Sequence, residues 1–146
     1  MTNDAATARG FLMRQRVARL ATVDESGAPH VVPVCFALVE QTVYIAIDEK
    51  PKRVGREVRR LQRLRNIAAE PRVALVADVY DDADWGRLGW VMARGTARVL
   101  EEGQEHAAAL AALRGKYAQY AAMALEGRPV IALAIERLTA WGELDT

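Results

Sequence analysis

Six short segments of β-branched and aliphatic residues place the tightest limit on the fold of this 146-residue chain. They are residues 17–23, 29–39, 42–47, 72–80, 88–100 and 129–135. The first three are joined by short turns such as Asp24-Glu25-Ser26-Gly27-Ala28 and predict an antiparallel meander. A chain of this length holds one domain, here residues 1–146. Because six short strands would otherwise leave edges exposed, we expect a mainly β (α+β) fold: a six-stranded antiparallel barrel, closed or half-closed, with peripheral helices.

Three helices are expected between these strands. The first begins after Asp4, and the third is Ala-rich and covers residues 103–124. The second begins at Pro51 and ends before Pro71, since the residue preceding a proline avoids the helical region. Its apolar side chains recur at helical spacing at Val54, Val58 and Leu61, and its arginines form a second stripe at Arg53, Arg56, Arg60 and Arg63.

Residues 50–65 concentrate positive charge. They hold eight basic residues against a single acid, Glu57, so the segment carries +7, and because the whole chain carries +1 the remainder carries −6. Such a segment repels itself unless an anion is bound. The negative remainder and the lack of aromatic residues in the segment oppose a nucleic-acid partner. A multiply charged cofactor is favoured, and Lys50 and Lys52 would meet it near the start of the expected helix.

The chain offers few residues for side-chain chemistry. Its one Ser, one Cys and two His are scattered at Ser26, Cys35, His30 and His106. No spacing suits a metal site or a Ser or Cys nucleophile, so no metal is expected. A cofactor would then carry the chemistry. The absence of a signal peptide, of a membrane-length apolar run and of a second Cys predicts a cytoplasmic protein without a membrane partner.

Two stretches, residues 19–34 (RLATVDESGAPHVVPV) and 63–75 (RLRNIAAEPRVAL), resemble the pyridoxamine 5′-phosphate oxidase-like, flavin-binding split β-barrels. Trp85 and the strand ending at residues 93–99 are similar too, and the likeness covers residues 10–140. Within that family the sequence looks most like the "PPOX class F420-dependent oxidoreductase" branch. The resemblance implies a split barrel that forms a homodimer, with two cofactor sites at the interface.

The resemblance also implies site residues. The cofactor ring would lie against the first strands, near Ala21, Thr22, Val32, Pro33 and Val34. The phosphate would be held among Lys50, Lys52, Arg60, Arg63 and Asn66. Trp85 and Trp141 would line the substrate side, and Trp141 would reach the partner's site. Each assignment has a structural alternative: strand core for the valines, helix capping for Asn66 and dimer packing for the tryptophans. Residues 54–59 are expected to lengthen the helix beyond the family pattern, which leaves open which basic side chains bind the phosphate.

The expected function is an F420-dependent oxidoreductase that transfers a hydride between the deazaflavin and a small planar organic substrate. A phosphomonoester such as that of FMN carries only about −1.5 to −2. F420 carries a phosphodiester and a tail of γ-linked glutamates, which suits the +7 segment better. Two alternatives stay open: an FMN-binding oxidase or reductase of the same fold, and a non-enzymatic flavin or deazaflavin carrier. The sequence identifies neither a proton donor nor the physiological substrate.

Overall fold

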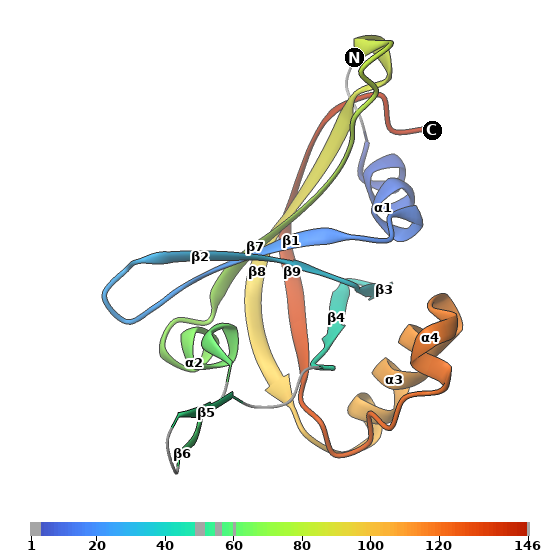
Figure 1. Ribbon diagram of the computed structural model, residues 1–146. Coiled ribbons are helices and arrows are strands. Elements are labelled where there is room, and N and C mark those ends of the chain that lie inside the picture. The colour runs from blue at the N-terminus through green and yellow to red at the C-terminus, as the bar shows by residue number, and fades with distance from the viewer. Residues whose placement is uncertain (1–3, 49–51, 55–56, 60, 146) are drawn as a thin grey trace.

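The computed structural model describes residues 4–48, 52–54, 57–59 and 61–145, and its main element is a curled antiparallel sheet (Figure 1). The sheet has seven strands in the order β2-β1-β7-β8-β9-β4-β3. They are β1 (Ala18–Val23), β2 (Pro29–Val34), β3 (Ala37–Val39), β4 (Thr42–Ala46), β7 (Arg72–Val79), β8 (Gly89–Leu100) and β9 (Val130–Gly142). The expected mainly β fold with peripheral helices is confirmed.

The strand count differs from the six expected because residues 29–39 form two strands. The chain leaves the ladder at Cys35 and Phe36, where the Phe36 N–H donates to the Tyr117 hydroxyl at 3.0 Å. β2 and β3 stand at opposite ends of the strand order, so this two-residue link brings the two edges of the curled sheet together (Figure 1). The result is a half-barrel. We call the gap between its β2 and β3 edges, at Cys35, the split. Pro33 lies on an edge strand, as its missing N–H predicts.

The long strands β8 and β9 pair from Gly89 opposite Gly142 to Leu100 opposite Val130, with a register shift at Arg94/Gly95. A side chain at residue 95 would collide with the Ala134 carbonyl oxygen, so only glycine allows β9 to approach this closely. The last strand runs seven residues beyond the expected 129–135, to Gly142. Its extension places Trp141 directly opposite Trp90.

Helices cover the sheet on two sides. α1 (Ala5–Arg14) begins as expected, with Asp4 accepting the Thr7 N–H at 2.7 Å, and buries Phe11 and Leu12 inside the curl. α3 (Gln104–Lys116) and α4 (Ala118–Ala121) pack on the other face, against β4 and β9. The helix expected over residues 103–124 is therefore divided at Tyr117, whose backbone is extended.

The helix expected from Pro51 to Pro71 is wrong over its first half. Residues Lys52–Val54 (β5) and Glu57–Arg59 (β6) pair as antiparallel strands, and α2 covers only Gln62–Ala69. Gly55 disfavours a helix, and the β-branched Val54 and Val58 suit strands. The residues of the expected apolar stripe, and those of the expected arginine stripe, therefore do not lie on one helix. The proposed extra turns are a hairpin, and Lys52 is not at a helix start.

Candidate functional site

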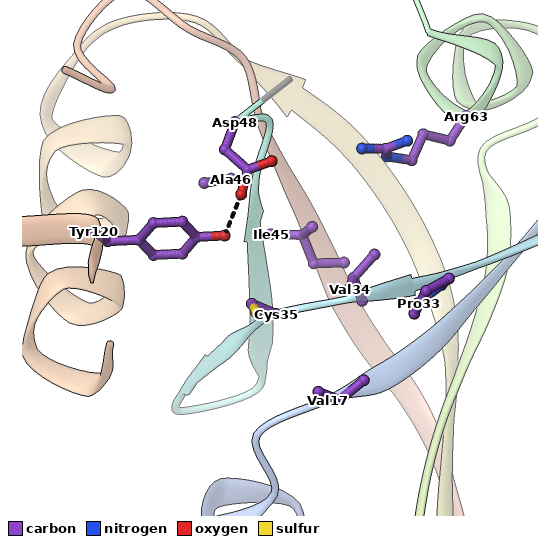
Figure 2. A pocket seen from close by; sticks show the side chains of 9 residues that line it. All are labelled: Val17, Pro33, Val34, Cys35, Ile45, Ala46, Asp48, Arg63 and Tyr120. Carbon is purple, nitrogen blue, oxygen red and sulfur yellow. Dashed lines mark hydrogen bonds between the residues drawn. The ribbon is translucent and has the colours of Figure 1, made fainter. Parts of the chain in front are cut away.

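The split of the half-barrel contains a cavity of about 200 Å³. Its walls come from the end of β2, the end of β4, α2 and α4, as Figure 2 shows. The lining residues are Val17, Pro33, Val34, Cys35, Ile45, Ala46, Asp48, Arg63 and Tyr120. Apolar walls with two charged groups are the usual make-up of a small-molecule site, in which the polar groups fix orientation.

Arg63 is the cation of this cavity. α2 carries it, only 8% of the residue is exposed, and its guanidinium extends from the helix toward the cavity (Figure 2). A guanidinium carries five N–H donors, so the Arg63 side chain can donate to a carbonyl or anionic oxygen of a molecule bound in the cavity.

Asp48 and Tyr120 form a fixed pair on the opposite wall. The Tyr120 hydroxyl donates to Asp48 Oδ2 at 3.0 Å, and Arg128 donates to the Asp48 carbonyl at 2.9 Å. Burial and then the neighbouring Asp48 carboxylate raise the pKa of Tyr120 far above its usual value, so the phenol stays protonated. Neither residue was predicted from the sequence to be part of the site. One available signal was that Asp48 directly follows the expected strand 42–47.

Thr22 and Asn66, both expected to bind cofactor, form a hydrogen bond with each other. Asn66 Nδ2 donates to Thr22 Oγ1 at 3.0 Å, and Gln62 donates to Asn66 Oδ1 at 2.6 Å. Both members of the Thr22–Asn66 pair are buried, so this pair fastens α2 to β1. The Asn66 side chain does not cap the helix end. Asn66 also lines a separate polar groove of about 470 Å³, which lies beside the turn at Asp24.

The expected ring-binding positions divide between two faces of the sheet. Pro33 and Val34 line the cavity. Val32 pairs with Leu20 and packs against the core, which agrees with its structural alternative. Ala21 pairs with Val31 on the outer face of the sheet and is not among the described residues that line the cavity.

The two tryptophans lie together, but away from the split cavity. Trp85, in a short 3-10 helix (η1, Trp85–Arg87), and Trp141 line a second hollow of about 340 Å³. The β7–β8 connection and the end of β9, which carry these two residues, lie at the end of the sheet remote from α2 (Figure 1). Both side chains are largely exposed. Within one chain, the expected substrate side and the expected cofactor side are therefore separate.

Three of the expected phosphate-binding residues have no described side chain. Lys50 and Arg60 lie outside the described residues, and Lys52 is placed only as the first residue of β5. Within the described ranges, no group of three or more His, Cys, Asp or Glu could hold a metal ion. No helix in the described part of the chain has both the length and the apolar character needed to cross a bilayer.

The fold is a half-barrel with a cavity at its split, and sequence comparison identifies the family. Residues 5–142 match the family described as Pyridoxamine 5′-phosphate oxidase. The chain belongs to this family. It is also similar to the 5a,11a-dehydrotetracycline/5a,11a-dehydrooxytetracycline reductase of Streptomyces rimosus, with 38% identity over 93 residues. That match covers 64% of this chain and only 61% of the reductase.

Solved structures share the fold at low sequence identity. A conserved hypothetical protein from Mycobacterium tuberculosis superimposes with a TM-score of 0.74 and 20% identity, over 97% of this chain and 86% of that one. A heme-binding protein from Mycobacterium smegmatis gives 0.73 and 22%, over 100% and 57%. A FAD-binding protein from Mesorhizobium loti gives 0.64 and 21%, over 96% and 95%. These likenesses show the fold.

Proposed function

We propose that the chain is an oxidoreductase, with residues 1–146 acting as one domain that binds a flavin-type cofactor at the split. The proposed cofactor is F420, and the reaction is hydride transfer between its deazaflavin and a small planar organic substrate. The observation that carries the proposal is the buried Arg63 guanidinium directed into the cavity opposite Asp48. The family and the similar reductase support oxidoreductase chemistry. The charge of +7 over residues 50–65 supports the more anionic cofactor.

The residues of the cavity fit the polar edge of a flavin or deazaflavin ring better than its phosphate. Tyr120 occupies one oxygen of Asp48, which leaves the other able to accept an N–H. A carboxylate in the same small cavity would repel a phosphate. Arg63 would therefore donate to a ring carbonyl and Asp48 would accept the ring imide N–H, while Lys50, Lys52 and Arg60 remain the proposed phosphate and tail ligands.

A reduced deazaflavin, when bound, supplies a hydride. The protein's part is to hold and orient the reactants. Arg63 and Asp48 would fix the ring's rotation through donor and acceptor contacts on one edge. Val34, Ile45 and Ala46 give apolar walls that exclude water. Tyr120 keeps Asp48 in place and, being protonated, adds no negative charge.

The split cavity, as the described residues form it, is too small for the whole cofactor. Ligand sites usually measure about 300–1,000 Å³, whereas this cavity measures about 200 Å³. We propose that a second copy completes the site by covering the outer face of β1, β2, β7 and β8. That face carries exposed Val31 (60%) and continues into the cavity through Pro33. We expect light scattering to show a homodimer for the wild type. For Val31→Glu we expect a monomer that binds the cofactor more weakly. A wild-type monomer that binds cofactor fully would contradict the dimer.

Equilibrium titration of the purified protein with F420 and with FMN tests the function. We expect F420 to bind and FMN to bind more weakly. Tight FMN binding without F420 binding would replace F420 by FMN, and binding of neither would refute the proposal. Turnover of reduced F420 with quinone, tetrapyrrole and dehydrotetracycline-type acceptors then separates an enzyme from a carrier, because a carrier binds F420 without consuming it.

A further inference from the structure

His106 is a buried histidine to which the proposed reaction gives no role. It lies in the first turn of α3, and only 5% of the residue is exposed. Its Nε2 lies 2.7 Å from the carbonyl oxygen of Arg128. A carbonyl oxygen can only accept, so Nε2 carries the hydrogen and is the donor. Because water has little access to the imidazole, losing this donor would be costly, and the hydrogen bond fixes the backbone at Arg128.

The backbone that His106 holds is tied in turn to the end of β4, where the chain reaches the split cavity. The Arg128 guanidinium donates to the Asp48 carbonyl oxygen at 2.9 Å, and Pro129 accepts the Ile47 N–H at 3.0 Å. Asp48 directly follows Ile47 and lines the cavity. A displacement of this segment would therefore move the backbone that carries the Asp48 carboxylate.

The Asp48 carboxylate itself is held by another part of the same helical region. The Tyr120 hydroxyl donates to Asp48 Oδ2 at 3.0 Å (Figure 2). The backbone of Tyr120 is held by Arg114, whose Nε donates to the Tyr120 carbonyl oxygen at 3.1 Å. Arg114, like His106, belongs to α3. α3 therefore fixes Asp48 twice: the carboxylate through Arg114 and Tyr120, and the backbone through His106 and Arg128.

We propose that His106 is a positioning residue of the split site. Through Arg128 it sets where the Asp48 backbone lies, and so how the Asp48 carboxylate faces Arg63 across the cavity. His106 is not among the described residues that line the cavity, so it acts on a bound molecule only through this connection. The inference rests on the proposed function, in which Asp48 accepts the ring imide N–H. Hydrogen bonds weaken steeply with misalignment, so a displaced Asp48 binds the ring less tightly.

Three variants separate the hydrogen bond of His106 from its contribution to packing. His106→Leu keeps much of the buried volume but removes the donor. His106→Gln restores an N–H at a similar distance from the backbone to that of Nε2. Leu144→Ala is the control for lost stability, because Leu144 is buried beside Gly89 at the start of β8, whereas α3 follows the end of that strand. Urea denaturation identifies conditions in which all three variants are folded.

Hydrogen exchange at the Ile47 amide measures the connection without any cofactor. This amide donates to Pro129, so His106→Leu should speed its exchange at least about tenfold relative to amides in the middle of β4. Equilibrium titration with F420 measures the effect on the site, and His106→Leu should bind F420 about three- to tenfold more weakly. His106→Gln and Leu144→Ala should stay within about twofold of the wild type in both measurements, since Gln keeps the donor and Leu144 is distant.

F420 binding that is unchanged in His106→Leu, or that falls equally in His106→Gln or Leu144→Ala, would overturn the proposal. Faster Ile47 exchange without weaker F420 binding would also overturn it, because His106 would then hold the segment without affecting the site. A wild type that binds no F420 refutes the proposed function instead, and Ile47 exchange then decides the positioning role by itself. Ile47 exchange in His106→Leu that matches the wild type refutes the positioning role even if F420 binds tightly.

Discussion

The split cavity and the C-terminal end of α3 each hold a buried cationic group, Arg63 and Lys116, but the surroundings of the two groups differ. Arg63 faces a cavity that contains the Asp48 carboxylate, whereas the Lys116 amine lies on two aromatic rings near Arg16. A guanidinium cannot give up its proton in a protein, so Arg63 must be offered acceptors. An amine can, so Lys116 adapts by losing charge. The first region is suited to recognising a polar ring, whereas the second buries an amine whose pKa is lowered.

The largest expected effect is on cofactor binding, and it distinguishes the role of Arg63 in the cavity from that of the other positive charges of residues 50–65. Arg63→Ala should weaken F420 binding by about 1.5–3 kcal/mol, the usual contribution of a charge-assisted hydrogen bond. Arg65→Ala, which removes the same charge from an exposed position on α2, should change binding only a few-fold because exposed charges are screened. Isothermal titration of both variants measures the difference. Equal losses would mean that only the overall charge of the segment matters.

The second expected effect concerns the hydrogen bond between Thr22 and Asn66, which holds the helix that carries Arg63. Thr22→Val removes the acceptor of the Asn66 side chain, and the unsatisfied buried amide should cost about 1–3 kcal/mol of the free energy of unfolding. Thr139→Val, a half-buried threonine on β9, should change it by less than about 0.5 kcal/mol. Urea denaturation provides both values. No difference between the two would show that the Thr22–Asn66 pair does not fasten α2.

The Lys116 surroundings predict a particular pH dependence of stability. The folded-state pKa of about 8 lies below the unfolded value of 10.5, so between these values the unfolded chain binds more protons and stability rises with pH. After allowance for partial solvent access, the rise should be about 1–2 kcal/mol. Lys116→Met should remove it and be more stable than the wild type at pH 7. A wild-type profile that matches Lys116→Met from pH 8 to 10.5 would contradict the lowered pKa.

The smallest expected effect concerns the opposite wall of the split. Tyr120→Phe removes the hydrogen bond that fixes Asp48 and should weaken F420 binding by about 0.5–1.5 kcal/mol. Tyr80→Phe provides a matched control, since Tyr80 donates to Asp82 at 2.8 Å in an exposed loop. Fluorescence titration should show no change for that control. A change of the same size in Tyr80→Phe would remove Asp48 positioning as the explanation.

Much of the sheet could be predicted because its signals are local. Alternating apolar residues and short turns identify β1, β2 and β4, and the Asp4 cap identifies the start of α1. Residues 52–59 were mistaken for helix because Val54 and Val58 are four residues apart, which fits a helix as well as a hairpin. The break at Phe36 depends on Tyr117, 81 residues away, so no local pattern could predict it.

The candidate site was predictable only in part, since it is assembled by distant contacts. The resemblance directed attention to Pro33, Val34 and Arg63, which do line one cavity. Asp48 and Tyr120 are 72 residues apart in the sequence, and no local sequence pattern predicts the hydrogen bond between them. The resemblance implied that Thr22 and Asn66 lie at the cofactor, and their hydrogen bond to each other across 44 residues could not be predicted from the sequence. Burial of the Lys116 amine likewise depends on Phe36, on another strand junction.

A crystal structure of the protein grown with F420 tests the central claim most directly. We expect the ring at the split, with one of its carbonyl oxygens within hydrogen-bond distance of the Arg63 guanidinium and its imide N–H facing Asp48. A second copy of the chain should close the open side of the cavity. A ring bound elsewhere, for example between Trp85 and Trp141, or a phosphate against Arg63, would contradict the account.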